Sequence, residues 1–295
     1  MSSIRNPYSA TPVPPPVGLL IRFAGQWIAG ETLEDALRAT REANAEGMEG
    51  ILNLLGEHYW DRAQVGETLR ECLRMVDAIA ERKLSASVSI KLSQFGLEFG
   101  RPYCVSQVLP LFDRLRAANG FLWLDMEDSR STDDTLAIYE DLLRRHPHVG
   151  VCLQANLRRT PRDLDRLLEL GGKVRLTKGA YRESPDVAYT SRAEVDAAYG
   201  RLLRALFEKG DRFGVATHDG KFIEEALRLS TLHKRTWDFQ MLMGVRDPMK
   251  RDLVGKGHRV SEYIPYGPNW LPYFSRRLRE RPRNLFTMAR SFVQG

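Results

Sequence analysis

Cysteine is scarce in this chain, and long apolar runs are absent from it. Cys72, Cys104 and Cys152 are the only cysteines among 295 residues, and their spacing fits neither a disulfide framework nor a zinc motif. No apolar run approaches the ~20 residues that span a bilayer. The N-terminus also lacks the charged and apolar regions of a signal peptide. We therefore expect a protein of the reducing cytoplasm.

Two further shortages exclude classes of function. The six histidines include no pair at helical spacing, so we expect no metal site and interpret His218 as a hydrogen-bonding residue. Basic and aromatic residues do not interleave and no reading module is present, so nucleic acid is not an expected partner. The net charge of +6 is concentrated in residues 271–295, which hold six arginines and one acid, Glu280. That concentration predicts an anionic substrate or an anionic membrane surface as partner.

Eight short apolar runs alternate with helical patterns along most of the chain. The expected strands are 51–55, 86–92, 121–126, 149–154, 174–178, 213–217, 237–242 and 260–264, and the helical patterns include 67–80, 105–118, 133–145, 161–170, 192–207 and 221–230. This alternation predicts an α/β fold, a closed (β/α)8 TIM-type barrel over residues 49–283. The alternative is an open doubly wound sheet, but Leu55-Gly56-Glu57 lacks the glycine fingerprint that usually follows its first strand.

The segments outside the expected barrel are short. Residues 1–17 predict a flexible proline-rich arm, and residues 18–48 predict an N-terminal helical segment with a helix over 31–45. The C-terminal tail, residues 284–295, carries apolar side chains that could cap the barrel or dock on lipid. We favour capping, and peripheral contact with the inner face of the membrane stays open.

Polar side chains end all the expected strands. They are Glu57, Lys91, Asp125 with Glu127, Gln154, Arg175 with Lys178, Thr217 with His218, Gln240 and Tyr263. The carboxyl ends of the strands of such a barrel gather at one mouth, where catalytic groups are found. We therefore expect these side chains to build one site.

Several of these side chains have more than one interpretation. Lys91 is rim-exposed, a Schiff-base amine, or the ion-pair partner of Asp125 on the neighbouring strand. Gln154 either satisfies the barrel backbone or hydrogen-bonds the edge of a flavin or nucleobase. Arg175 and Lys178 precede a Gly-Ala turn, and cations beside small residues suit a phosphate.

A basic face is expected on the helix that follows the last strand. Residues 270–280 predict this helix, on which Tyr273, Arg276, Arg277 and Glu280 share one side. The face is either an anion clamp or an ordinary solvated surface. The polar strand ends at one mouth favour the clamp, with the helix lying over the barrel mouth.

Seven motifs resemble, in order, those of the proline dehydrogenase family. They are Ser-Ile-Lys-Leu-Ser, Leu-Asp-Met-Glu-Asp, Val-Arg-Leu-Thr-Lys-Gly-Ala-Tyr, Ala-Thr-His, Phe-Gln-Met-Leu, Tyr-Ile-Pro-Tyr-Gly and Tyr-Phe-Ser-Arg-Arg-Leu-Arg-Glu. The resemblance covers residues 22–283 and implies a barrel that holds non-covalent FAD. It also implies oxidation of L-proline to Δ1-pyrroline-5-carboxylate, the first step of proline catabolism to glutamate, with electrons passed to a quinone.

The resemblance implies roles for individual residues. Arg175 is similar to the residue that hydrogen-bonds the flavin N5, and the implied catalytic set is Arg175, Lys91, Asp125 and Tyr263. The implied substrate-binding residues are Lys91, Ala180, Tyr181, Leu242, Tyr263, Tyr273 and the carboxylate clamp Arg276 and Arg277. The implied cofactor-binding residues are Gln154, Arg175, Lys178, Gly179, Ala180, Thr217, His218 and Gln240. Glu57 resembles a gate residue that pairs with Arg276 on closure, and Glu280 helps to hold the arginine pair.

The chain departs from the family pattern at two positions. Arg182 stands where the large bifunctional relatives have tryptophan, and Asp219 replaces a familiar asparagine, so the nucleotide contacts stay open. The chain has no room for an aldehyde dehydrogenase domain, and we expect a separate pyrroline-5-carboxylate dehydrogenase to take the product. A Schiff-base aldolase that uses Lys91 or Lys178, and a non-catalytic barrel that binds anions or membrane, remain alternatives.

Overall fold

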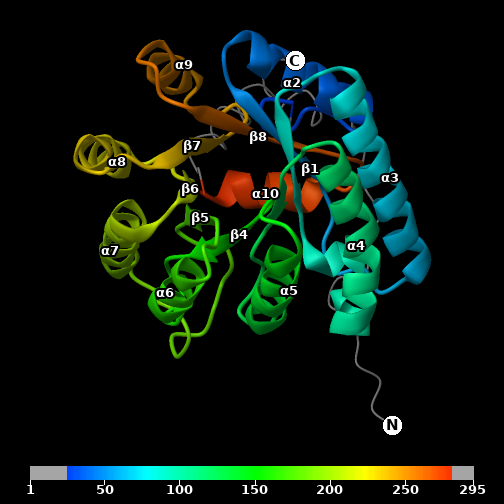
Figure 1. The fold of residues 1–295 in the computed structure, drawn as a ribbon, viewed down its shortest axis with the longest axis horizontal. Coiled ribbons are helices and arrows are strands. Elements are labelled where there is room, and N and C mark those ends of the chain that lie inside the picture. The colour runs from blue at the N-terminus through cyan, green and yellow to red at the C-terminus, as the bar shows by residue number, and fades with distance from the viewer. Residues whose placement is uncertain (1–24, 281–295) are drawn as a thin grey trace, which may run out of the picture.

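Eight parallel strands close into a barrel in the order of the sequence, because β8 pairs back to β1 (Figure 1). The computed structural model describes residues 25–280, with side chains up to Ser275. The strands are β1 (Glu49–Leu54), β2 (Ala86–Ile90), β3 (Leu122–Leu124), β4 (Val149–Gln154), β5 (Val174–Thr177), β6 (Arg212–Val215), β7 (Thr236–Leu242) and β8 (Val260–Tyr266). The predicted TIM-type barrel is confirmed, and the closed strand order excludes the open sheet.

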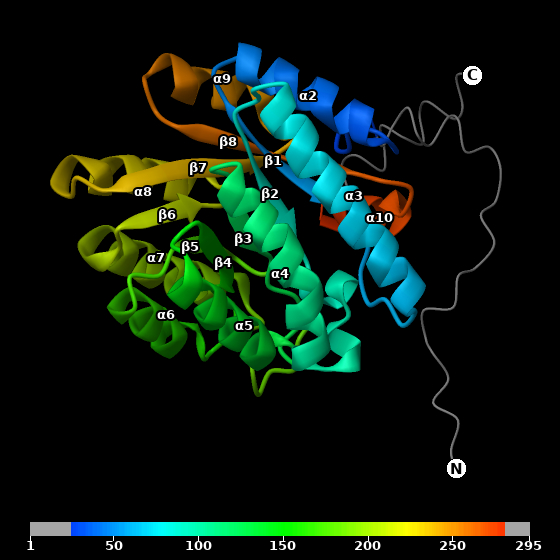
Figure 2. The same cartoon turned by 45° about the vertical axis from the view of Figure 1, so that its right-hand side comes forward.

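The helices that connect successive strands lie around the outside of the barrel (Figures 1 and 2). The helices are α2 (Leu33–Ala45), α3 (Arg62–Glu81), α4 (Arg101–Ala117), α5 (Thr132–Arg145), α6 (Thr160–Glu169), α7 (Arg192–Lys209), α8 (Gly220–Leu232), α9 (Asp247–Gly255) and α10 (Trp270–Glu280). The longer helices bury an apolar stripe: Val65, Cys72 and Val76, for example, lie on the buried side of α3. The helices therefore cover the outer face of a sheet whose inner face is free to build a site.

The ends of several elements differ from the predicted ones, and one helix was not among the predicted patterns. The helix expected from 67 begins at Arg62, because the side chain of Asp61 accepts a hydrogen bond from the Ala63 N–H and caps a first turn with little apolar periodicity. Helix α9 buries only Lys250 and Leu253, too few positions for its pattern to stand out. Strand β2 ends before Lys91, which instead starts a short 3-10 turn, η1 (Leu92–Phe95).

The N-terminal helix covers the outside of β1 and β8, where the helix after the last strand would otherwise pack. Helix α2 starts at a capping box formed by Thr32 and Asp35 and packs against β1 and β8. Helix α10 lies instead at the carboxyl ends of the strands. Its Phe274 packs on Trp27 with ring centroids 5.6 Å apart, and the segment before α2 therefore holds α10 over the mouth.

A buried cation ties the end of β7 to β8. Lys250 is 1% exposed, and its Nζ donates to the carbonyl of Leu242 (3.3 Å) and to the carboxylate of Glu262, with Asp247 Oδ1 at 2.6 Å. Burial raises the pKa of Glu262, and the charge of Lys250 opposes that shift. The C=O of Leu242 is thereby held from outside the barrel.

Several expectations concern segments beyond the described part of the chain. The proline-rich arm (1–17) and the C-terminal tail (284–295) lie outside it, as do the side chains of Arg276, Arg277 and Glu280. Within residues 25–280, no helix combines the length and apolar character needed to cross a bilayer.

Candidate active site

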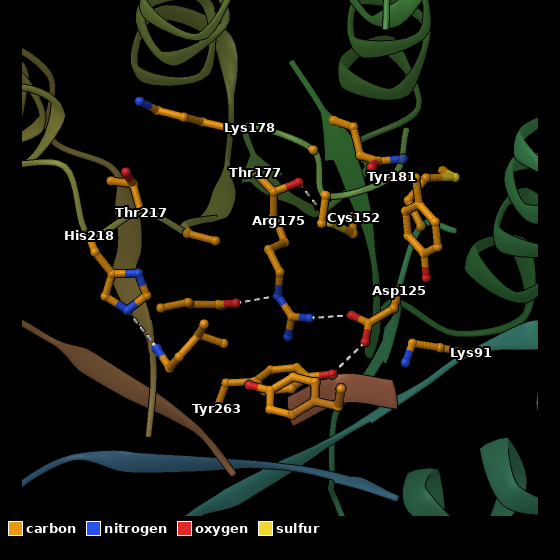
Figure 3. A pocket seen from close by; sticks show the side chains of 18 residues that line it. Lys91, Asp125, Cys152, Arg175, Thr177, Lys178, Tyr181, Thr217, His218 and Tyr263 are labelled. Carbon is orange, nitrogen blue, oxygen red and sulfur yellow. Dashed lines mark hydrogen bonds and ion pairs between the residues drawn. The ribbon is translucent and has the colours of Figure 1, made fainter. Parts of the chain in front are cut away.

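A cavity of about 430 Å³ opens at the carboxyl ends of the strands (Figure 3). Its walls are Lys91, Asp125, Met126, Cys152, Gln154, Arg175, Thr177, Lys178, Gly179, Ala180, Tyr181, Ala216, Thr217, His218, Gln240, Leu242, Tyr263 and Tyr273. The expected site residues with described side chains line it, except Glu57 and Glu127. Glu57 contacts the wall residue Lys91, and the carbonyl of Glu127 accepts a hydrogen bond from Gln154. Four wall residues were not among the predicted site residues: Met126, Cys152, Thr177 and Ala216. Met126, Cys152 and Ala216 carry no chemical signal in the sequence, and Thr177 was seen only as part of the Val-Arg-Leu-Thr-Lys motif.

Arg175 is the centre of the cavity floor. Its Nη1 donates to Asp125 Oδ1 (2.6 Å) and Ser89 Oγ (3.0 Å), and its Nε donates to Gln240 Oε1 (2.5 Å). The guanidinium also lies over the ring of Trp123, 4.6 Å from the centroid. Arg175 is only 3% exposed, so these contacts hold a buried charge in one orientation.

One end of this guanidinium has no partner among the described side chains. Nη2 of Arg175 is buried, and no hydrogen-bond acceptor of residues 25–275 reaches it. An unsatisfied buried donor on a charged group costs free energy, so it marks a place where a ligand acceptor is expected. The cavity size is also ordinary for a cofactor site.

Asp125 joins Arg175 to the opposite wall. Its Oδ2 accepts a hydrogen bond from the Tyr263 hydroxyl (2.7 Å), and its Oδ1 accepts from Ser89 Oγ (2.9 Å). Burial, and next the negative charge of Asp125, raise the pKa of Tyr263 well above its usual value. The phenol therefore stays protonated and donates to Asp125 (Figure 3).

Lys91 pairs with Glu57 and not with Asp125, the ion-pair partner that was one of its three interpretations from the sequence. The Nζ of Lys91 lies 2.9 Å from Glu57 Oε1, and the side chain of Lys91 is 9% exposed. The difference has two causes. Lys91 lies in the turn after β2 and points toward the loop after β1. Asp125 instead accepts a hydrogen bond from Arg175 inside the barrel. Glu57, for which the resemblance implies a gate role, is thus engaged by Lys91.

A buried carboxylate beneath this pair organises the turn after β2. Glu127, 1% exposed, accepts from the backbone N–H of Ser93 (3.1 Å) and from its hydroxyl (2.6 Å). Burial raises the pKa of Glu127. The same Ser93 Oγ accepts from the His58 N–H, and Gln154 Nε2 donates to the Glu127 carbonyl. The sequence placed Glu127 at a strand end but showed no role for it.

Replacing Ser93 with alanine is expected to lower the free energy of unfolding by about 1–3 kcal/mol, because Glu127 would lose a buried hydrogen bond. Urea unfolding measures the change. Ser106→Ala is the matched control, since Ser106 is exposed on α4 and should change stability by at most about 0.5 kcal/mol. Equal stability of the two variants would contradict the structural role of Ser93.

Lys178 stands at the far wall between two carboxylates. Its Nζ donates to Asp196 Oδ1 (2.6 Å) and Asp219 Oδ2 (2.8 Å), and the bond from Lys178 is the main cause that lowers the pKa of Asp219. The next residue, Gly179, has φ +104° and lies against Asn156, where a Cβ would come within 2.0 Å of Oδ1. The turn therefore needs glycine, and it brings backbone to the cavity wall.

His218 braces the end of β7. Its Nε2 accepts from the backbone N–H of Leu242 (2.9 Å), which assigns the proton of the neutral ring to Nδ1. Leu242 is held at both ends of its peptide, since Lys250 binds its carbonyl. Across the described residues, no group of three or more His, Cys, Asp and Glu side chains has a metal-binding arrangement.

Tyr273 is the residue through which α10 reaches the cavity. It is 8% exposed and lines the same cavity as Arg175 and Lys178. The helix continues to Glu280, so Arg276 and Arg277 follow Tyr273 by about one turn.

Known proteins match this chain along nearly its whole length. The proline dehydrogenase family model matches residues 36–290. A proline dehydrogenase of Deinococcus radiodurans is 35% identical over 281 residues, 92% of this chain and 91% of that protein. Proline dehydrogenase 2 of Bacillus subtilis strain 168 is 33% identical over 265 residues, 89% of this chain and 88% of that protein.

Solved structures agree on the fold. Proline utilization A from Bdellovibrio bacteriovorus, inactivated by N-propargylglycine, superposes with a TM-score of 0.81 at 24% identity. The match covers 88% of this chain and 32% of that one, so this chain spans about a third of the longer protein. The family model and the two full-length relatives confirm the resemblance drawn from the motifs: the chain belongs to the proline dehydrogenase family.

Proposed function

We propose that this protein oxidises L-proline to Δ1-pyrroline-5-carboxylate with non-covalently bound FAD, and that the electrons pass to a quinone. The unpartnered Nη2 of Arg175 carries the proposal, because it is a buried cationic donor on a residue that lines a cavity built from the family's motifs. The test is product analysis: proline consumed with a quinone acceptor should yield a cyclic imine. No consumption of proline by flavin-loaded protein would sink the proposal.

The cavity walls fit such a cofactor. Gln154, Arg175, Lys178, Gly179, Ala180, Thr217, His218 and Gln240 would hold FAD. Bound FAD would supply the acceptor for the hydride that leaves C5 of proline. The Nη2 group of Arg175 would place positive charge beside that acceptor, where it favours the reduced form. Lys178 can reach a phosphate only by sharing or leaving Asp196 and Asp219, so these acids set the cost of that contact.

The opposite wall suits a small amino acid. Tyr263, Tyr273 and Leu242 offer ring-sized apolar surface, with Tyr181 and Ala180 beside them. Lys91, with Glu57, and Asp125 place charge at the rim for the zwitterion. The arginines at 276 and 277 would grip the carboxylate, so that C5 faces the hydride acceptor and the ring nitrogen gives up its proton before oxidation. Exchange of Arg276 between solvent and Glu57 would then close the site.

Arg276→Ala and Arg277→Ala are each expected to raise the KM for proline about 10- to 150-fold with little change in kcat. The loss of a charged hydrogen bond to the carboxylate, about 1.5–3 kcal/mol, sets that range. Steady-state kinetics measure it. Arg144→Ala, at an exposed site on α5, is the control for loss of charge. An unchanged KM for proline in both variants would contradict the role of Arg276 and Arg277 in binding the carboxylate.

Tyr263 is expected to make the enzyme prefer proline over 4-hydroxyproline. Its hydroxyl is fixed on Asp125, so the ring cannot swing away to admit a hydroxyl on the substrate. The ratio of kcat/KM for the two substrates measures this preference, and Tyr263→Ser should narrow it. Comparable values for the two substrates in the wild-type enzyme would contradict the role.

The competing classes receive less support from the geometry. A Schiff-base aldolase needs a neutral amine that can attack a carbonyl, whereas Lys91 and Lys178 are both ion-paired with carboxylates. Borohydride trapping with a carbonyl substrate would reveal such an enzyme. A barrel that only binds anions or membrane would show no turnover of proline.

The remaining partners follow from the same chemistry. The product is an imine in equilibrium with an aldehyde, so a separate pyrroline-5-carboxylate dehydrogenase is the expected consumer. We propose a cytoplasmic enzyme without nucleic-acid partners, whose quinone acceptor could bring it to the inner face of the membrane. Flotation with quinone-containing vesicles tests that contact.

A further inference from the structure

Beneath the cavity, side-chain hydrogen bonds connect Arg175 to the floor of the barrel. Gln240, which accepts from Arg175 Nε, donates through Nε2 to Asp238 Oδ1 (3.2 Å), and Ser261 Oγ donates to Asp238 Oδ2 (2.5 Å). Asp238 and Gln240 are two residues apart on β7, so both lie on its inner face. Asp238 is not among the residues that line the cavity.

The neighbouring strand leaves just enough room for these hydrogen-bonded side chains. Gly214 on β6 lies opposite Asp238, and a Cβ there would come within 2.4 Å of Gln240 Nε2. Gln240 itself is 6% exposed. The amide is therefore enclosed, and a displacement of Gln240 would be passed to the groups that it touches.

The chemistry of the side chains fixes which group donates and which accepts in each of these hydrogen bonds. Arginine only donates, so Gln240 must turn its oxygen toward Arg175 and its NH₂ toward Asp238. A carboxylate only accepts, and Asp238 accepts from Gln240 on one oxygen and from Ser261 on the other. Asp238 thus fixes the orientation of the amide that holds Arg175.

This hydrogen-bond network also places a second negative charge, that of Asp238, near Arg175. Asp125 contacts the guanidinium from the cavity side, and Asp238 lies one amide away on the floor side. Burial raises the pKa of Asp238, while the bonds from Ser261 and Gln240 and the charges of Arg259 and Arg175 oppose that shift. Glu49 and Arg212 are further charged groups near Asp238: burial and next the charge of Asp238 raise the pKa of Glu49, and Arg212 opposes that shift.

We propose that Asp238 is a positioning residue for proline oxidation: as a carboxylate, it acts through Gln240 to hold the guanidinium of Arg175 in place in the cavity wall, and its charge offsets part of the positive potential at the cofactor. The proposal rests on the flavin chemistry proposed above. Asp238, which lies outside the cavity, would thus determine both the orientation of Arg175 and its electrostatic effect.

The first test follows the Arg175 Nε–H in the protein as purified, with or without flavin. Arginine-labelled protein is compared by NMR, and the resonance is assigned by its loss in Arg175→Lys. Asp238→Asn is expected to speed hydrogen exchange at this site about tenfold, as loss of roughly one net hydrogen bond gives. Ser261→Ala keeps the charge of Asp238 and removes only one of its hydrogen bonds, so it should speed hydrogen exchange at Arg175 less. Unchanged exchange in both variants overturns the positioning role.

The second test is the reduction potential of the bound flavin. Asp238→Asn removes a negative charge near Arg175, so the potential should move to a more positive value, and kcat should change while KM for proline stays near wild type. Asp252→Asn, an exposed site on α9, is the control for charge. A potential that stays fixed or becomes more negative overturns the electrostatic role.

The two tests separate this proposal from the proposed function. If the protein binds no flavin or does not oxidise proline, the proposed function fails, while the exchange rate at Arg175 still decides whether Asp238 holds it. If flavin is reduced by proline but Asp238→Asn leaves both exchange and potential unchanged, the function stands and the role of Asp238 is overturned.

Discussion

Replacing Arg175 with methionine is expected to lower kcat for proline by about 100- to 1,000-fold, the usual effect of removing one preorganised charge-stabilising donor. Arg175 is the only residue in the cavity wall that combines a buried positive charge with a donor unpartnered among the described side chains. Methionine keeps an unbranched chain of similar reach and removes the charge. Steady-state kinetics with a saturating acceptor, together with the rate of flavin reduction, measure the effect.

Two further variants distinguish charge from geometry at this site. Arg175→Lys keeps the charge, but a single ammonium cannot bond to Asp125, Ser89 and Gln240 at once, so we expect it to recover only part of the rate. Arg158→Met, which removes a cation stacked on Tyr189 outside the cavity, should leave kcat within a few-fold of wild type. Near-normal flavin reduction in Arg175→Met would show that this arginine is not catalytic.

Replacing Lys250 with methionine is expected to lower the free energy of unfolding by about 3–5 kcal/mol, the cost of leaving a buried charge without its partner. Glu262 is the group left behind, and Leu242 loses the donor to its carbonyl. Urea unfolding measures the loss. Lys256→Met is the matched control, because Lys256 is exposed and its pairing with Asp252 should contribute at most about 1 kcal/mol.

The loss at Lys250 should depend on pH with a defined sign. The folded-state pKa of Glu262 is raised already and would rise further without Lys250. The folded state then binds the proton more tightly than the unfolded state, so stability falls as pH rises from the unfolded pKa toward the folded one. Lys250→Met should therefore be less destabilised near pH 4.5 than at pH 7, and Lys250→Met/Glu262→Gln should regain stability. Loss equal to that of Lys256→Met would contradict this account.

The barrel could be predicted because its signal is local and repeated. Each strand is a short apolar run, and each helix has apolar residues at helical spacing, so eight repeats leave few topologies. Element ends were harder, since Asp61 and Lys91 end elements by capping and turn geometry, which apolar periodicity does not record. Helix α9 was overlooked because its buried face includes a lysine.

The candidate site shows where sequence reasoning reaches its limit. The strand-end rule brought polar residues to one mouth, and the structure places those of them with described side chains at one cavity or in contact with it. Pairing could not be predicted: Asp125 has three donors and Lys91 turns to Glu57, because rotamers depend on packing across the barrel. Glu127 and Asp238 were missed as functional because their roles pass through Ser93 and Gln240.

The most direct measurement is the visible spectrum of the purified protein before and after anaerobic addition of L-proline. The account predicts flavin bands near one FAD per chain that bleach with proline and return when a quinone is added. A colourless protein that cannot be reconstituted with FAD, or a flavin band that proline leaves unchanged, would contradict it.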